Sequence, residues 1–515
     1  MSSSIHQLMV CSPSAIAPPV LLGAEVLSVS AILITNYSVE VPQTYNFNHP
    51  AISVKDVDFC NVTVTYTYPG ENDAIHVETW LPRVWNERLQ ATGGAGWTAG
   101  RNVLSPGFMS GAIGEGYATT STDAGLPPVW PGDPTLWALV SQGNVNSYVL
   151  DTFAYRSLEE QALIGKSLVR SFYGRDPAYS YWSGCSQGGR QGLMLAQRFP
   201  TLYDGIAAAA PAIYYGQLGQ SQFIPQLIMN EMKAYPLDCE MDYLTEQAVA
   251  HCDANDGVVD GIISDVASCD FDPMSEIDSS FLCFSTRANM TVSQTAAVVA
   301  NASWNGYFNS QWEFIWPGWN YGANLTGLGY APNETNQTAN ALRTPNWFAQ
   351  LYLERNASFD SATITSDMFD RYWKQFIKIY DDTIGTSDPD LSDFKAAGGK
   401  MITWHGMADE LIQTKATERY YQEVTNLFPD VQDFYRYFES PGAGHCGYTG
   451  VGGQPTTVFD ALRAWVENGT APDVLPVTFN GTTNNVYNRN LCLYPLKQVY
   501  KGSGDPTSSD SFDCV

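Results

Sequence analysis

Strand and helix patterns alternate along most of the chain. Apolar and polar residues alternate in 62–68 and again in 75–81, which predicts two strands that turn at 69–72. Apolar residues recur every three to four positions in 157–172, which predicts a helix. Further strands are expected at the start of 88–97, at 117–122, 179–184, 205–210, from 400 onward and at 434–438, and further helices at 191–199, 415–427 and 456–466. Strands that alternate with helices predict a parallel sheet and the α/β class.

This pattern is interrupted between residues 213 and 397. The stretch is rich in Asn, Asp, Thr and aromatic residues, and strand and helix patterns do not alternate in it. We interpret it as an inserted domain, so that residues 1–212 and 398–515 form the main domain. Residues 1–60 are interpreted as a Pro- and Ser-containing N-terminal segment.

Composition narrows the possible partners. The 515 residues are 44% hydrophobic, which is enough for a large core and more than one domain. The net charge of −27 disfavours nucleic acid and anionic membranes as partners, because phosphate binding needs clustered Lys and Arg. Uninterrupted apolar runs are too short for a transmembrane helix. Nothing in the sequence indicates an oligomeric state.

Cysteines and glycosylation sequons indicate export. The ten cysteines form an even set, as expected of a disulfide-bonded extracellular protein. Residues 1–10 lack the pattern of a signal peptide, but we still predict a secreted glycoprotein because sequons are dense. The sequons are at Asn36, Asn61, Asn289, Asn301, Asn324, Asn333, Asn336, Asn356, Asn468 and Asn480.

Residues 179–190 place a serine between a predicted strand and a predicted helix. Ser186 stands in Gly184-Cys-Ser-Gln-Gly188, and a third glycine follows at 189. Gly-x-Ser-x-Gly in this context is typical of a nucleophile elbow, whose glycines let strand and helix approach while the serine hydroxyl stays exposed. A glycine-rich turn without chemistry is the alternative.

A serine nucleophile needs a base and an acid. Of the six histidines, His445 follows the last predicted strand, in the chain order Ser, Asp, His that is typical of α/β-hydrolases. His405 is the alternative base, and it can equally be a packed histidine beside the acid loop. Asp409 follows the strand that begins at 400 and is the predicted acid, with Glu410 as the alternative.

Cysteines stand beside both candidate catalytic residues. Cys185 precedes Ser186 and Cys446 follows His445, so a hydrogen bond between serine and histidine would bring the cysteines within disulfide distance. Position along the chain suggests three further pairs, and elimination leaves a fourth. These pairs are Cys11 with Cys60, Cys252 with Cys269, Cys492 with Cys514 and, by elimination, Cys239 with Cys283.

Residues 252–263 hold three aspartates and an asparagine around two glycines. Hard oxygen ligands on a tight loop suit Ca²⁺, while an Asx-Gly turn without metal is the alternative. This is not an EF-hand loop, because position 12 counted from Asp253 is Ser264 rather than Glu. The predicted ligands are the carboxylates of Asp253, Asp256 and Asp260 and the backbone carbonyls of Val258 and Ile262.

Together these motifs resemble the tannase and feruloyl esterase family of fungal secreted esterases, from about Cys60 to Val466. The resemblance implies an α/β-hydrolase core with a large inserted lid that holds a structural Ca²⁺. It also implies the triad Ser186, Asp409 and His445 and a disulfide that joins the cysteines beside the serine and the histidine.

We therefore expect a secreted serine carboxylic ester hydrolase that acts on esters of plant phenolic acids, either small esters or feruloylated polysaccharide. Feruloyl esters are favoured over galloyl esters because the chain lacks the dibasic pair that we associate with cleavage of fungal tannases. An acyltransferase or an inactive binding relative is the alternative of another class. The predicted oxyanion hole consists of the N–H of Gln187 and one N–H from Gly93-Gly94.

The inserted segment contains a dense aromatic run between residues 304 and 321. Such rings most often form a core, but they can also form an aromatic wall over the serine on which a phenolic acid stacks. Trp312, Trp316 and Trp319 are the candidates for that wall, and Trp97 is the next place to look.

Overall fold

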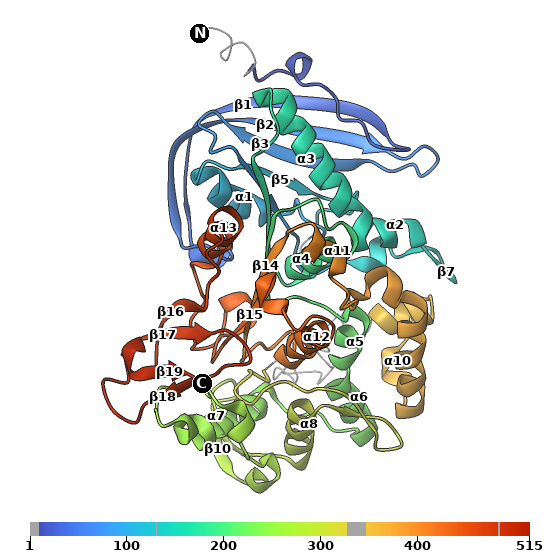
Figure 1. Cartoon of the computed structure of the whole chain (residues 1–515). Helices are drawn as coiled ribbons and strands as arrows, with labels where there is room; N and C mark the ends of the chain where they lie inside the picture. The colour runs from blue at the N-terminus through green and yellow to red at the C-terminus, as the bar shows by residue number, and fades with distance from the viewer. Residues whose placement is uncertain (1–9, 130, 327–346, 483–484) are drawn as a thin grey trace.

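The computed structural model describes residues 10–129, 131–326, 347–482 and 485–515. Its centre is a nine-stranded sheet with the order β1-β2-β3-β5-β4-β8-β9-β14-β15 (Figure 1). The strands are β1 Glu25–Val41, β2 Ile52–Thr67, β3 Ile75–Pro82, β4 Arg88–Thr92, β5 Ala118–Thr122, β8 Tyr179–Cys185, β9 Gly205–Ala209, β14 Lys400–Gly406 and β15 Tyr435–Ser440. Strands β1, β2, β3 and β5 pair antiparallel, and the pairs from β5 to β15 are parallel.

Helices cover both faces of the sheet because neighbouring residues of each strand point to opposite sides. In β8, Tyr181 belongs to a core cluster with residues of α1 and α13, whereas Trp182 belongs to a cluster with residues of α3, α4 and α12. Both side chains are fully buried. The helices of this part are α1 Ser105–Gly114, α2 Ser147–Asp151, α3 Ser157–Tyr173, α4 Gln187–Arg198, α12 Thr414–Leu427 and α13 Val458–Asn468.

Most predicted elements are confirmed, including the hairpin of β2 and β3 and the helices α3, α12 and α13. Helix α4 begins at Gln187, four residues earlier than predicted, because its first turn contains the glycines that we read as part of the turn.

The interpretation of residues 1–60 was incomplete. Residues 25–41 form the 17-residue strand β1, and β2 begins at Ile52 instead of near residue 61. Strand β1 lies at the edge of the sheet and buries only Val41 fully, so its apolar residues do not alternate strictly with polar ones. Three register shifts in its pairing with β2 interrupt the spacing of its partly buried residues, and such a strand lacks the periodicity from which strands are predicted.

Residues 213–397 form helices and two small hairpins, none of which joins the large sheet in the part that the structure describes. Figure 1 shows α6, α7 and α8 below the sheet. The boundaries at 212/213 and 397/398 stay a prediction. Sequons Asn333 and Asn336 lie outside the described residues. The elements are α5 Tyr215–Ser221, α6 Ile224–Met232, α7 Asp238–Cys252, β10 Ser280–Cys283, β11 Ala288–Thr291, α8 Gln294–Asn305, β12 Tyr307–Phe308, β13 Phe314–Trp316, α10 Ser366–Tyr380 and α11 Ser392–Ala396.

Short hairpins and five disulfides complete the fold. The hairpins are β6 Leu139–Ser141 with β7 Asn144–Val145, β16 Val474–Asn480 with β17 Val486–Cys492, and β18 Gln498–Tyr500 with β19 Phe512–Cys514. All five predicted disulfides are confirmed, and no cysteine is free. Within the described ranges, no helix has the length and apolar character that a membrane span requires.

Candidate active site

Ser186 occupies a sharp turn between β8 and α4. Its φ of +63° is uncommon for a residue with a side chain, and such strain is typical of functional turns. The flanking glycines are required by close packing. A Cβ on Gly184 would lie 2.5 Å from the carbonyl carbon of Gly188, and a Cβ on Gly189 would lie 2.3 Å from the carbonyl oxygen of Ala209. The predicted strand, turn and helix therefore present Ser186 as a nucleophile elbow does.

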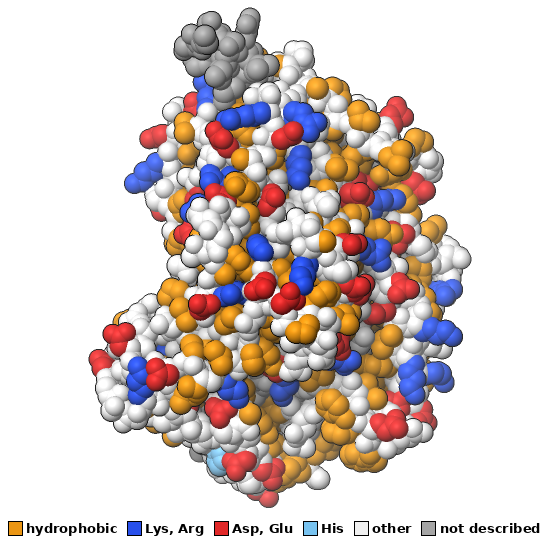
Figure 2. All heavy atoms as spheres, viewed as in Figure 1, with side chains coloured by type: hydrophobic (Ala, Val, Ile, Leu, Met, Phe, Trp, Pro, Cys, Tyr) orange, Lys and Arg blue, Asp and Glu red, His pale blue; other side chains and the backbone are white. Residues whose placement is uncertain are grey.

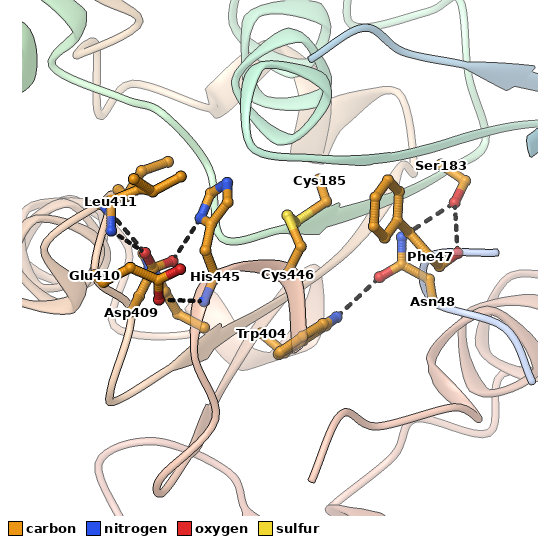
Figure 3. Close-up of a disulfide and its surroundings, with 12 residues drawn as sticks. Phe47, Asn48, Ser183, Cys185, Trp404, Asp409, Glu410, Leu411, His445 and Cys446 are labelled. Atoms are coloured by element: carbon orange, nitrogen blue, oxygen red, sulfur yellow. Dashed lines mark hydrogen bonds and ion pairs between the residues drawn. A yellow bond between two sulfur atoms is a disulfide. The ribbon is translucent and has the colours of Figure 1, made fainter. Parts of the chain in front are cut away.

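The loops after β14 and β15 bring Asp409 and His445 together. Asp409 Oδ2 accepts a hydrogen bond of 2.8 Å from His445 Nδ1 (Figure 3). Its Oδ1 accepts from the backbone N–H groups of Leu411 and Ile412, each at 2.8 Å. Because Nδ1 donates to the carboxylate, Nε2 of the neutral ring keeps the lone pair that a general base needs.

Glu410, the alternative acid, does not contact the imidazole ring in this way. Its carboxylate accepts from the backbone N–H of His445 at 3.1 Å and from the hydroxyl of Thr449 at 2.8 Å. Glu410 thus holds the backbone of the histidine loop, while Asp409 holds the ring.

His405, the alternative base, is fully buried and contacts the same oxygen of Asp409 as His445 does. Its Nε2 lies 3.1 Å from Asp409 Oδ2, and its Nδ1 lies 2.8 Å from the hydroxyl of Thr417. A carboxylate can only accept, so His405 donates through Nε2 and its Nδ1 accepts from Thr417. Both ring nitrogens are occupied, so His405 has no free nitrogen for a reacting serine.

These contacts shift the pKa values of the acid and the histidine. Burial alone would raise the pKa of Asp409, but attraction to His445 and hydrogen bonds from both histidines hold it well below its usual range. Burial lowers the pKa of His445, but Asp409 raises it more strongly, so the result lies above the ordinary value. The carboxylate is therefore ionised at neutral pH, and the imidazolium is stabilised as soon as it forms.

The disulfide between Cys185 and Cys446 joins the serine turn to the histidine loop. The two Cα atoms are 6.1 Å apart, and Figure 3 shows the bond beside the pair of His445 and Asp409. Among the described hydrogen bonds, Ser186 takes part only through its backbone N–H and carbonyl groups. Catalytic hydrogen bonds are often long without substrate and tighten when it binds.

A cavity of about 430 Å³ opens beside Ser186. Both the main domain and the inserted segment supply its wall, and most wall side chains are apolar or aromatic. Apart from Ser186 and Gln187, its polar side chains are those of Asp133, Gln222 and Tyr215. The remaining wall residues are Gly96, Trp97, Val129, Pro131, Gly132, Ala212, Leu218, Gly219, Trp347, Phe348, Leu411 and Ile412.

The predicted oxyanion hole is only partly available. The N–H of Gly94 donates to Gln191 Oε1 at 2.8 Å, and the N–H of Gly93 donates to the carbonyl of Ser183 at 3.3 Å. Neither group is free to bind an oxyanion, which differs from the prediction. The N–H of Gln187 has no described hydrogen-bond partner, and the same is true of Gly96, which lines the cavity.

The tryptophans of the inserted segment do not line the cavity. Trp316 and Trp319 are 1% and 3% exposed and belong to core clusters, whereas Trp312 is 85% exposed on the hairpin of β12 and β13. The favoured interpretation as core residues is confirmed for Trp316 and Trp319, and the alternative of an aromatic wall over the serine does not hold at these three positions. Trp97 does line the cavity, where it packs against Tyr215 at 5.2 Å between ring centroids.

Other wall residues were missed by sequence reasoning. Val129, Leu218 and Phe348 come from three separate loops and helices, and no local pattern distinguishes them from core residues. Gly219 lies among them because a Cβ there would lie 1.9 Å from the ring of Phe348, a contact that only the structure shows.

The aspartate-rich loop forms a compact structure about α7. The carboxylate of Asp253 accepts from the N–H groups of Asp260 and Gly261 at 3.2 and 3.0 Å. Asp260 is buried, its Oδ2 pairs with Arg489 at 3.0 Å, and its Oδ1 has no partner. Burial, repulsion by Asp256 and repulsion by Asp253 raise the pKa of Asp260 to about 6, against the opposing effect of Arg489. In the described ranges, no three His, Cys, Asp or Glu side chains already converge as a metal site.

Comparisons with known proteins agree with this architecture. A sequence profile described as tannase and feruloyl esterase matches residues 60–515. A probable feruloyl esterase of Arthroderma benhamiae is 38% identical over 98% of this chain and 93% of its own length. Among solved structures, the tannin acyl hydrolase from Aspergillus niger superposes with a TM-score of 0.88 at 29% identity, covering 99% of this chain and 95% of its own. Feruloyl esterase B from Aspergillus oryzae gives 0.77 at 25% identity, covering 96% and 97%. The expected α/β-hydrolase fold with a lid is confirmed.

Proposed function

Because the chain belongs to the tannase and feruloyl esterase family, we propose that it hydrolyses carboxylic esters of phenolic acids with Ser186 as nucleophile. The observation that carries this proposal is the pairing of His445 with Asp409 beside a strained serine turn that opens into an apolar cavity. Serine, histidine and aspartate in these roles form an acyl-enzyme and then hydrolyse it.

The reaction proceeds in two displacements. Ser186 Oγ attacks the ester carbonyl carbon while its proton passes to His445 Nε2. The bond from carbon to the alcohol oxygen then breaks, and His445 returns the proton to the leaving alcohol. Water repeats the sequence on the acyl-enzyme and releases the acid. Asp409 stays ionised throughout and stabilises the imidazolium.

Two backbone N–H groups are proposed to hold the oxyanion. Gln187 stands at the start of α4, where unbonded N–H groups and the helix dipole favour negative charge. Gly96 replaces Gly93 and Gly94 in this role, because its N–H has no described partner and the residue lines the cavity.

Feruloyl esters are the proposed substrates within this class. A cavity of about 430 Å³ suits a small aromatic acid. Its largely apolar wall fits the methoxy group and propenyl linker of a ferulate, whereas the three phenolic hydroxyls of a gallate require several hydrogen-bond partners. The 38% identical relative is named as a probable feruloyl esterase. Galloyl esters remain the second candidate, favoured by the tannin acyl hydrolase structure with its TM-score of 0.88.

A substrate panel tests this assignment. Methyl ferulate, methyl caffeate, methyl p-coumarate and methyl gallate are compared by kcat/KM, with Ser186→Ala as control. We expect ferulate to be preferred and Ser186→Ala to lose all but about a millionth of kcat. A preference for gallate overturns the feruloyl assignment. Ester exchange that outpaces hydrolysis when an acceptor alcohol is added identifies an acyltransferase instead.

We also propose that Ca²⁺ binds the loop of residues 253–262. The buried Oδ1 of Asp260 lacks a partner, and burial together with repulsion by Asp256 and Asp253 raises the pKa of Asp260, as expected where a cation is needed. Asp253, Asp256 and Asp260 would hold the ion, with the carbonyls of Val258 and Ile262. The ion would supply positive charge that stabilises the loop, which Cys252 and Cys269 close.

Secretion as a glycoprotein is proposed from the disulfides and sequons. Five disulfides are typical of an oxidising compartment. Sequon side chains at Asn36, Asn289 and Asn480 are exposed, as glycosylation requires. On the face shown in Figure 2, basic side chains are scattered among acidic ones. We therefore propose no nucleic-acid partner. A mass shift on enzymatic removal of N-glycans tests the glycosylation.

A further inference from the structure

Arg190 is a buried cation immediately behind the candidate nucleophile. It lies on α4, three residues after Gln187 and four after Ser186, and its side chain is 0% exposed. Residues three apart on a helix share a face, with about 5–6 Å between their Cβ atoms. The guanidinium therefore lies close to the residue whose N–H is proposed to hold the oxyanion.

All hydrogen-bond acceptors of Arg190 are neutral. Its Nε donates to Gln187 Oε1 at 2.8 Å, and its terminal nitrogens donate to the carbonyls of Ala154 and Phe153 at 3.1 and 3.4 Å and to the hydroxyl of Thr386 at 3.1 Å. No carboxylate among the described residues neutralises it. Burial lowers the pKa of Arg190 to about 10, partly offset by Tyr215, so the side chain is still charged at neutral pH.

An unpaired charge in a protein interior is expensive, and apolar replacements of buried ionic groups are often neutral or stabilising. Packing alone therefore does not explain an arginine here. The guanidinium also lies over the rings of Phe153 and Tyr215, each at 5.6 Å, and Tyr215 lines the cavity. Arg190 thus contacts the serine turn through Gln187, the cavity wall through Tyr215 and the inserted segment through Thr386.

We propose that Arg190 is a positioning residue that holds Gln187 and favours negative charge at the oxyanion position. This inference rests on the proposed ester hydrolysis. During each displacement the carbonyl oxygen becomes an anion beside the N–H of Gln187. A fixed charge in a low-dielectric site stabilises that anion without reorganisation, whereas the neutral ester gains little. The charge of Arg190 should therefore raise kcat and leave KM unchanged.

Boronate binding measures this effect apart from turnover. When phenylboronic acid binds, the oxygen of Ser186 adds to the trigonal boron and its proton passes to His445, which leaves a tetrahedral anion. Ferulamide serves as the neutral ligand of the same cavity. Both dissociation constants are measured for wild type, Arg190→Met, Arg190→Lys and Thr386→Val, together with kcat and KM for p-nitrophenyl acetate and the melting temperature.

We expect Arg190→Met to weaken phenylboronic acid binding and to lower kcat, each about tenfold, with ferulamide affinity and KM unchanged. Arg190→Lys should retain part of the effect because it keeps the charge. Thr386→Val removes the hydroxyl that accepts from Arg190 and donates to the carbonyl of Ile384, keeps the guanidinium and its bond to Gln187, and should resemble wild type. Unchanged boronate affinity in a folded Arg190→Met variant overturns the inference. An equal loss of ferulamide affinity in that variant overturns it too, and so does a Thr386→Val variant that loses as much boronate affinity as Arg190→Met. Failure of wild type to bind the boronate through Ser186 contradicts the proposed function itself.

Discussion

Two buried carboxylates in separate regions of this molecule, Asp409 and Asp260, have different surroundings. Asp409 accepts hydrogen bonds from two histidines and two backbone N–H groups, and its pKa lies well below its usual range. Asp260, in the loop beside α7, has one arginine as partner, an unbonded oxygen and a pKa of about 6. All oxygens of the first carboxylate accept hydrogen bonds, whereas at the second site one arginine faces the three carboxylates of Asp253, Asp256 and Asp260. This difference predicts chemistry at one site and ion binding at the other.

The largest expected difference between the two regions is in the rate of hydrolysis. Asp409→Asn retains the shape of the carboxyl but favours the wrong tautomer of His445, so kcat should fall about 10⁴-fold. Asp260→Asn should leave kcat within about twofold at a temperature where the protein is folded. Measured kcat for methyl ferulate checks both, and equal losses in the two variants would remove the distinction.

Each region is closed by its own disulfide. The bond between Cys185 and Cys446 spans 261 residues and that between Cys252 and Cys269 spans 17, so the entropy model gives about 5.6 and about 3 kcal/mol of stabilisation. We expect replacement of either pair by serine to lower the free energy of unfolding, and the loss of the bond between Cys185 and Cys446 to lower it more. Only the first replacement should also lower kcat, because only that bond joins the serine turn to the histidine loop. The comparison fails if the loop disulfide proves as important for kcat.

Calcium removal should affect only the loop region. An ion at a hundredfold excess over its Kd adds about 2.7 kcal/mol of stability, so EGTA should lower the melting temperature by a few degrees and leave kcat unchanged when the protein is folded. Because the pKa of Asp260 is higher in the folded state than in the unfolded chain, the calcium-free protein binds a proton more tightly when it is folded. The stability that this proton provides is fully present below the unfolded pKa and is lost as pH rises through about 6. The effect of EGTA should therefore be smaller at pH 5 than at pH 7. Melting curves unaffected by EGTA at both pH values would return the loop to an ordinary turn.

The smallest expected effect comes from His405. Its removal takes one donor from Asp409, which should lower kcat about tenfold and leave KM unchanged, because His405 does not line the cavity. A less neutralised Asp409 should raise the pKa of His445 further, so the acid limb of the profile of kcat against pH should move to higher pH. His405→Gln, which can still donate to Asp409, should recover part of the rate. An unaltered pH profile in His405→Ala would make the residue a packing element only.

The sequence predicted those features that depend on neighbours in the chain. Ser186 was recognised because its glycines are adjacent, and the disulfide between Cys185 and Cys446 followed from their positions beside Ser186 and His445. Strand β1 was missed because its burial at the sheet edge has no regular period. The role of Gly94 was misassigned because its N–H is taken by Gln191, almost a hundred residues away in the chain, and no local pattern encodes such a contact. The cavity wall depended in the same way on packing between distant segments.

The central claim is that Ser186 is the nucleophile of a phenolic ester hydrolase. The most direct test is inactivation with a fluorophosphonate while methyl ferulate hydrolysis is followed, with the labelled peptide identified by mass spectrometry. The account predicts one label per chain, located on Ser186, and a loss of ferulate hydrolysis in proportion to labelling. A label on another residue, or hydrolysis that persists in fully labelled protein, would contradict it.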